Sequence, residues 1–131
     1  MSEVRDGLLY TKDHEWSKVE GDRVRIGITD HAQHELTDLA FLQLPKLGQK
    51  VKKGDALAIV ESVKNTADVY SSVTGEVVEV NSPLEDDPAA VNKDPYGEGW
   101  LAVVRASDIS ETKPMLDANA YRELLQRSGK D

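Results

Sequence analysis

The chain has 131 residues, of which only 5% are aromatic, so its core must be built mainly from Val, Leu, Ile and Ala. Acidic residues number 24 against 16 lysines and arginines, and the resulting net charge of −8 disfavours binding to a nucleic acid. The sequence contains no cysteine, which excludes disulfides, thiolate metal sites and cysteine nucleophiles within the chain.

The first ten residues, MSEVRDGLLY, lack the cationic segment and apolar run of a secretory signal. No apolar stretch approaches the roughly 20 residues that a membrane-spanning helix needs. We therefore expect no membrane partner and a soluble intracellular protein. It would reside in the cytoplasm of a bacterium or in the mitochondrial matrix of a eukaryote.

The first half of the chain predicts short strands and one helix. In DRVRIGIT (22–29), apolar residues alternate with polar or small ones, which is typical of a half-buried strand. DHAQHEL (30–36) predicts a short helix with Asp30 as its N-cap and Gln33 three positions later. LAFLQLP (39–45) is an apolar strand that ends at a proline.

The second half continues this β pattern and ends in a helix. Strands are predicted in ALAIVES (56–62), ADVYSSV (67–73), TGEVVEV (74–80) and WLAVVRA (100–106), with DPYGEGW (94–100) as a rigid loop. Asp117 can cap a final helix that Gly129 ends. The pattern predicts a single domain over 1–131 that is mainly β, a compact sandwich or barrel with peripheral short helices.

A lysine occupies the break between two of these strands. Only Val63, Lys64 and Asn65 remain between Ser62 and Thr66 to reverse the chain, and asparagine suits such a turn because it tolerates positive φ. An exposed lysine is poorly suited to act as a catalytic base or to form a Schiff base. It can instead be acylated, which gives a long arm on a firm support and raises the local concentration of the attached group. The alternative is an ordinary surface lysine.

Five stretches make the sequence similar to the glycine cleavage system H protein family. In family order they are YTKDHEW (10–16), GITDHAQ (27–33), FLQLPKLGQKVKKGD (41–55), VESVKNTADVYSSVTGEVVEVN (60–81) and PYGEGW (95–100). In that family the lysine of the ESVK motif carries lipoic acid in amide linkage, and this lysine is Lys64 here. The resemblance implies a lipoyl/biotinyl-type β-sandwich, a barrel-sandwich hybrid. Its lipoyl hairpin would lie at about 57–73 and its C-terminal helix at about 117–128.

The resemblance implies a carrier subunit without catalytic residues of its own. Its partners would be a pyridoxal-phosphate glycine decarboxylase (P protein), an aminomethyltransferase (T protein) and a dihydrolipoyl dehydrogenase (L protein). A lipoate ligase or lipoyl transferase would attach the cofactor. We expect the carrier to be a monomer, because it must move between these enzymes.

The aminomethyl cargo implies a protective cleft, because its carbon lies between sulfur and an amine and water can hydrolyse it. Carboxylates would accept charge-assisted hydrogen bonds from the cationic amine. The candidates are Glu15 in the HEW motif, Asp68 after the hairpin and Asp13. Their alternative interpretation is as surface acids. The DPYGEGW loop is expected to form a wall beside the arm.

Two positions depart from the family pattern. Thr37 stands where the family usually has glycine, so we expect a strained backbone costing about 1 kcal/mol or more if that position requires positive φ. Asn65 stands where alanine is common. Neither residue bears on attachment, but both leave room for a divergent paralogue.

The histidines and tryptophans are weaker candidates for a binding site. His31 and His34 have a spacing that can bind a metal, but a third ligand is not apparent, so we predict no metal site. Trp16 and Trp100 are expected to fill the core or its rim.

Four alternative functions differ in their sequence features. A lipoyl domain of a 2-oxo-acid dehydrogenase complex would be shorter and joined to a flexible linker. A biotin carrier usually has methionines on both sides of its lysine, whereas Val63 and Asn65 flank Lys64 here. An H-like lipoyl relay or redox-signalling target stays open, since its attachment chemistry would be identical. An interaction-only β domain would carry no modification.

Overall fold

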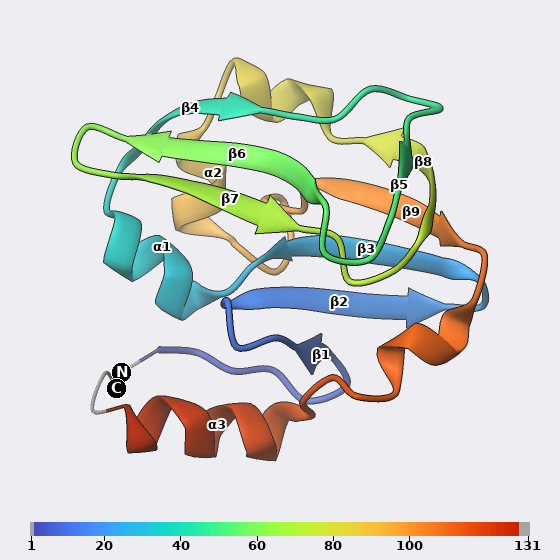
Figure 1. Ribbon diagram of the computed structural model, residues 1–131. Coiled ribbons are helices and arrows are strands. Elements are labelled where there is room, and N and C mark those ends of the chain that lie inside the picture. The colour runs from blue at the N-terminus through green and yellow to red at the C-terminus, as the bar shows by residue number, and fades with distance from the viewer. Residues whose placement is uncertain (1, 129–131) are drawn as a thin grey trace.

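Over residues 2–128, the computed structural model consists of two antiparallel β-sheets with short helices around them (Figure 1). The larger sheet has the strand order β1-β2-β3-β9-β8-β5, and the smaller sheet has the order β4-β6-β7. The strands are β1 (Leu9–Tyr10), β2 (Glu15–Glu20), β3 (Arg23–Ile28), β4 (Leu39–Gln43), β5 (Lys50–Val51), β6 (Ala56–Ser62), β7 (Thr66–Tyr70), β8 (Gly75–Val80) and β9 (Ala102–Ala106). The helices are α1 (Asp30–Leu36), α2 (Ala89–Lys93) and α3 (Ala118–Arg127), with 3₁₀ turns η1 (Ser82–Glu85) and η2 (Ile109–Thr112).

The main core lies between the two sheets. Val24 and Ile26 of β3 are fully buried, and they belong to one apolar cluster with Val60 of β6 and Val69 of β7. Alternation places every second residue of these strands on the core face, and this burial is the main favourable term in folding. The predicted mainly β fold with peripheral short helices and a C-terminal helix is confirmed.

A second, aromatic cluster fixes α3 against the larger sheet. The rings of Tyr10 and Tyr121 stack with centroids 4.5 Å apart and planes inclined by 4°. Trp16 is 1% exposed, pairs with Gly27 across β2 and β3, and donates its indole N–H to the Pro95 carbonyl at 3.0 Å. A Cβ atom at Gly27 would lie 2.6 Å from this indole, so the glycine makes room for the ring. The predicted core placement of Trp16 is confirmed.

The N-cap predicted for α1 was wrong by one residue. Thr29 is the N-cap, and its hydroxyl accepts a hydrogen bond from the Ala32 amide at 3.2 Å. Asp30 is the first helical residue, where its negative charge still favours the helix N-terminus. For α3, the predicted N-cap is confirmed, because the Asp117 carboxylate accepts from Ala120. The predicted end at Gly129 lies outside the described residues.

The link between α1 and β4 has a strained backbone, as the sequence predicts. Thr37 adopts φ 66° and ψ −157°, a conformation that favours glycine. Asn92 of α2 holds this link, because its amide donates to the Thr37 carbonyl and its carbonyl accepts from the Leu39 amide, both at 2.9 Å. The link therefore leads directly into β4, which pairs with the hairpin strand β6.

Within residues 2–128, no helix is both long and apolar enough to cross a bilayer.

Candidate functional site

The hairpin of β6 and β7 reaches past α1 and ends in a tight turn (Figure 1). Lys64 lies in this turn and is exposed, and the neighbouring Val63 is 96% exposed. In the described part of the chain, no hydrogen bond or ion pair engages the ε-amine of Lys64. A cationic amine is thus held in solvent at the apex of a paired, rigid support.

Ser62 fastens the turn through both its backbone and its hydroxyl. The Ser62 amide donates to the Asn65 carbonyl at 2.8 Å, and the Ser62 hydroxyl accepts from the amides of Lys64 and Asn65 at 3.2 and 3.0 Å. Asn65 does not have positive φ, so the reason given for it from the sequence was wrong. The sequence signal that was missed is Ser62, which precedes Lys64 by two residues and Asn65 by three. A serine in this position is typical of a turn stabilised by a serine hydroxyl.

The base of the hairpin is tied to β2 of the other sheet. Glu15 accepts a hydrogen bond from the Tyr70 amide at 2.7 Å, and the hydroxyls of Ser17 and Ser72 lie 2.9 Å apart. Because Glu15 and Ser17 are two residues apart on a strand, they lie on the same face. One part-buried and one buried polar link therefore hold the end of β7 and the residues after it against β2.

The environment of Glu15 is unusual for a carboxylate. Its residue is 3% exposed, and the Thr11 hydroxyl donates to Oε1 at 2.7 Å while the Tyr70 amide reaches Oε2. Burial raises the pKa of Glu15, these two hydrogen bonds lower it, and the nearby charge of Asp13 raises it further. None of the ion pairs among the described residues includes Glu15, so this buried carboxylate has no cationic partner there.

The other two predicted acids, Asp68 and Asp13, are exposed and lie on different parts of the chain. Asp68 is exposed on β7, two residues before the amide that Glu15 binds. Asp13 is exposed in the loop before β2 and contributes to the pKa of Glu15. Glu15 is therefore bonded to the edge of β7, the strand that carries Asp68, whereas Asp13 is linked to Glu15 through its charge.

The loop that carries Asp13 and Glu15 is braced by the C-terminal helix. His14 has a positive φ of 69°, and its Nδ1 lies 2.8 Å from the Tyr121 hydroxyl of α3. The same hydroxyl lies 2.8 Å from the hydroxyl of Thr29, the N-cap of α1. Sequence patterns did not reveal this brace, because its members are about 90 to 107 positions apart in the chain.

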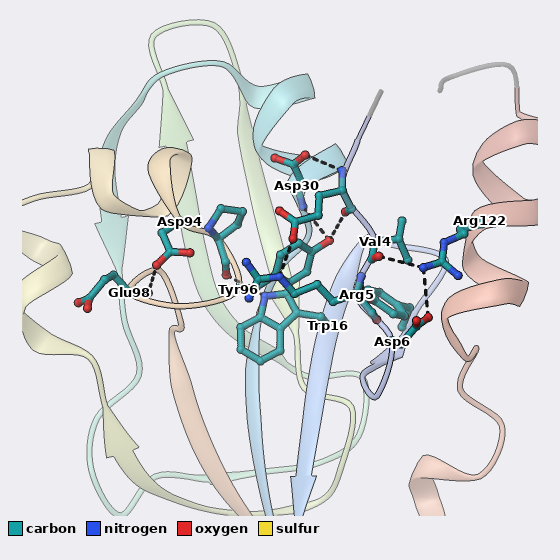
Figure 2. A network of polar contacts seen from close by, with 12 residues as sticks. Val4, Arg5, Asp6, Trp16, Asp30, Asp94, Tyr96, Glu98 and Arg122 are labelled. Carbon is teal, nitrogen blue, oxygen red and sulfur yellow. Dashed lines mark hydrogen bonds and ion pairs between the residues drawn. The ribbon is translucent and has the colours of Figure 1, made fainter.

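An N-terminal segment fastens α1 and α3 from outside, as Figure 2 shows. The Tyr96 hydroxyl donates to the Glu3 carbonyl at 2.7 Å and accepts from the Asp30 amide at the start of α1. Arg122 of α3 donates to the Val4 carbonyl at 3.0 Å. The loop predicted in DPYGEGW is rigid, since the Asp94 carbonyl accepts from the amides of both its glycines. Its role as a wall beside the arm stays a prediction.

The two histidines of α1 have separate surroundings. His31 is buried with its Nε2 3.4 Å from Glu35, and exposed His34 lies 3.9 Å from Asp30. Within residues 2–128, no group of three or more metal-binding side chains is arranged to hold an ion.

A two-sheet scaffold that holds a lysine outward in a hairpin turn is the arrangement expected of a carrier domain. A sequence profile of the family described as Glycine cleavage H-protein matches residues 8–128. The glycine cleavage system H proteins of Coprothermobacter proteolyticus and Stenotrophomonas maltophilia are each 50% identical to the chain. The alignments cover 93% and 96% of this chain and 97% of each relative.

A solved structure has the same fold. The crystal structure of a glycine cleavage system H protein from Mycobacterium marinum superposes with a TM-score of 0.84 at 38% identity, covering 96% of this chain and 99% of that one. The chain belongs to the glycine cleavage H-protein family. Members of this family are the lipoyl carriers of the glycine cleavage system, so the chain is a carrier subunit and not a catalyst. It works with the other enzymes of that system, and the family's cofactor is lipoate.

Proposed function

We propose that Lys64 is the residue that carries the lipoyl group, in amide linkage to its ε-amine. The observation that supports this is its exposed position in the serine-fastened turn between β6 and β7. An attaching enzyme can reach an amine that no other side chain engages, and the paired strands behind it fix the point from which the arm extends. When bound, the lipoyl group supplies a disulfide that accepts the aminomethyl unit and is later reoxidised.

The attachment step itself needs only the amine of Lys64 and an activated acyl group. A ligase would join lipoate to ATP as an acyl adenylate, with release of pyrophosphate. The Lys64 amine then attacks the carboxyl carbon, the C–N bond forms, the acyl–phosphate bond breaks, AMP leaves and the displaced proton passes to water.

The test is modification followed by digestion. The chain is incubated with a purified lipoate ligase, lipoic acid and ATP, and its tryptic peptides are weighed. We expect trypsin to skip Lys64 and to leave one longer peptide that is heavier by one lipoyl group. The Lys64→Arg variant keeps the positive charge but should gain no mass and support no glycine cleavage. A wild-type chain modified at another lysine would refute the assignment.

We further propose that Glu15, Asp68 and Asp13 stabilise the loaded arm. A buried carboxylate without a cationic partner is unfavourable by itself, and the cationic amine of the cargo would supply that partner. Glu15 is 3% exposed and held in place by Thr11 and Tyr70, so it can present its charge without reorganising. Exposed Asp68 and Asp13 would contact the cargo from the rim.

Isosteric variants remove the charges with little change of shape. In Glu15→Gln the amide oxygen can still accept from the Tyr70 amide, while the amide nitrogen would donate to the Thr11 hydroxyl. In Glu15→Gln with Asp68→Asn, we expect normal lipoylation but faster loss of the aminomethyl group to water. Glu20→Gln, at the exposed far end of the same strand β2, is the matched control. The cleft proposal fails if the loaded double variant and the loaded control release formaldehyde at the same rate.

The partners follow from the same proposal. The loaded arm would visit the glycine decarboxylase, the aminomethyltransferase and the dihydrolipoyl dehydrogenase, and a lipoate ligase or lipoyl transferase would modify Lys64 beforehand. We expect the carrier to act as a monomer, in the cytoplasm of a bacterium or in the mitochondrial matrix of a eukaryote. Sedimentation of the purified chain tests the oligomeric state.

A further inference from the structure

A tyrosine hydroxyl of the C-terminal helix is linked to the loop that leads to Glu15. Helix α3 lies beside β1 at the edge of the larger sheet (Figure 1). Tyr121 of this helix is fully buried, and its ring stacks on the ring of Tyr10. Its hydroxyl lies 2.8 Å from Nδ1 of His14 and 2.8 Å from the hydroxyl of Thr29. A phenol can donate one hydrogen bond and accept another, so this oxygen can serve both neighbours.

The turn from β1 into β2, residues 11–15 and here called the acid loop, is held by a closed set of contacts. The His14 amide donates to the Thr11 carbonyl at 3.1 Å, and the Thr11 amide donates to the Glu15 carbonyl at 3.1 Å. The Thr29 amide donates to the His14 carbonyl at 3.0 Å. His14 is thus fixed at its backbone by Thr29 and at its side chain by the tyrosine hydroxyl. Its φ of 69° is uncommon for a residue other than glycine, and such a conformation persists only where neighbours impose it.

The position of the Glu15 carboxylate depends on this loop. Thr11, at the start of the acid loop, donates to Oε1 at 2.7 Å, and the Tyr70 amide donates to Oε2 at 2.7 Å. Since His14 directly precedes Glu15, a shift of His14 would move the carboxylate out of line with the Tyr70 amide. Glu15 is only 3% exposed, so the same shift would also admit water.

We propose that Tyr121 is a positioning residue for the aminomethyl cargo, because its hydroxyl, acting through His14, keeps the Glu15 carboxylate in place. The inference rests on the proposed role of Glu15 in stabilising the loaded arm. A charge that is already fixed stabilises a cationic amine better than a charge that must first reorganise. A displacement of about 1 Å is enough to weaken such an interaction strongly.

Two stacked tyrosines provide a variant and its matched control. Tyr121→Phe removes the hydroxyl and leaves the ring, so the stack with Tyr10 can remain. In Tyr10→Phe the lost hydroxyl is one that accepts from the Arg5 amide at 2.8 Å and donates to the Arg5 carbonyl at 2.6 Å. Both variants lose a hydrogen-bonded hydroxyl from a fully buried residue, so both should lower Tm. The link to the acid loop is lost in Tyr121→Phe alone.

The first assay measures how long the cargo survives. Each carrier is lipoylated, loaded by the decarboxylase with glycine and separated from the enzyme, and the release of formaldehyde is then followed. We expect Tyr121→Phe to lose its cargo about tenfold faster than wild type, and Tyr10→Phe to stay within about twofold of wild type. Equal release by the two tyrosine variants would overturn the inference, because the Tyr121 hydroxyl would then act on stability alone.

A second readout needs neither cofactor nor cargo. In the unmodified chain the Tyr70 amide is bonded to Glu15, so its hydrogen exchange reports whether the carboxylate is in place. Relative to the amides of the core strand β3, the Tyr70 amide should exchange faster in Tyr121→Phe than in Tyr10→Phe. A merely structural role of Tyr121 would speed exchange throughout the chain and leave this ratio the same in both variants, which would also overturn the inference.

Variants of His14 test the same link from its other end, and they decide the question if Tyr121→Phe does not fold. Asparagine tolerates positive φ, and its side-chain amide has a hydrogen-bonding atom where His14 has Nδ1. Glycine also accepts positive φ but has no side chain. His14→Asn should therefore keep its cargo nearly as long as wild type, whereas His14→Gly should lose it as fast as Tyr121→Phe. Equal lifetimes for these two His14 variants would refute the link.

Failure of the proposed cleft is a separate outcome. If the loaded double variant Glu15→Gln with Asp68→Asn keeps its cargo as long as Glu20→Gln, the cleft proposal fails and the role of Tyr121 fails with it. That result is obtained with Tyr121 intact, so it is distinct from a failure of the positioning role alone.

Discussion

Thr37→Gly should stabilise the protein, because it removes a side chain from a backbone conformation that only glycine adopts readily. Thr37 has φ 66° and ψ −157° at the C-terminus of α1, and it is exposed. Its backbone hydrogen bonds to Gln33 at 3.0 Å and Asn92 at 2.9 Å do not involve the side chain. A glycine can therefore keep both bonds and the path into β4.

Two opposing terms set the size of the gain. A non-glycine residue in this region of φ and ψ costs about 1–3 kcal/mol. Glycine lowers stability by about 0.4–1 kcal/mol through the greater freedom of the unfolded chain. Since exposed Thr37 loses little packing, the free energy of unfolding should rise by about 1 kcal/mol. For a domain of this size, such a gain raises Tm by about 3–5 °C.

The assay is thermal and urea unfolding of the wild type, Thr37→Gly and Thr37→Ala. Alanine retains Cβ, so it should keep most of the strain and stay within about 0.5 kcal/mol of the wild type. The reasoning is refuted if the glycine variant is no more stable than the alanine variant, because backbone strain would then not be the controlling term.

Three further variants test the packing and electrostatics around the site. In Glu15→Gln the side-chain oxygen can still accept from the Tyr70 amide, and the new amide nitrogen would donate to the Thr11 hydroxyl. Because burial raises the pKa of Glu15, its ionised form lowers stability at neutral pH. The variant should be more stable than wild type at pH 7. This gain should shrink as the pH falls toward 4.5, the ordinary pKa of a glutamate. A difference in urea midpoints that does not change with pH would contradict this explanation. Gly27→Ala should lose about 2 kcal/mol or more, because its Cβ would lie 2.6 Å from the Trp16 indole; an unchanged Tm would show that the ring moves freely. Asp117→Ala should lower stability by about 1 kcal/mol through loss of the α3 cap, whereas Asp117→Ser should retain most of it in the same melts.

The parts of the fold that the sequence predicted are those governed by local rules. Strand β3 was predicted because apolar residues alternate with polar or small ones, and the start of α3 because an aspartate such as Asp117 can accept from a nearby amide. Strand β2 was missed for a physical reason. Its first three residues, Glu15, Trp16 and Ser17, are all buried although two of them are polar, so polarity does not indicate which side of this strand faces the core.

Some features of the site could be predicted from the sequence, whereas its long-range contacts could not. The reversal of the chain at Lys64 follows from the short break between two strands, but the hydroxyl of Ser62 that fastens it was not anticipated. Glu15 was singled out by the family resemblance, whereas its bond to the Tyr70 amide joins residues 55 positions apart. Contacts at such separation depend on how the two sheets face each other, and a pattern within one strand carries no information on that arrangement.

The buried polar links on β2 suggest why this strand tolerates such a costly composition. If Glu15 and Ser17 were replaced by apolar residues, the core would gain burial, but the end of β7 would lose the acceptor for the Tyr70 amide. That amide lies on an edge strand, where an unpaired donor weakens the support of the hairpin. A carrier needs a lysine that is mobile at its tip and fixed at its base. We therefore interpret the buried Glu15 as a residue whose stability cost is offset by the fixed position it gives the hairpin.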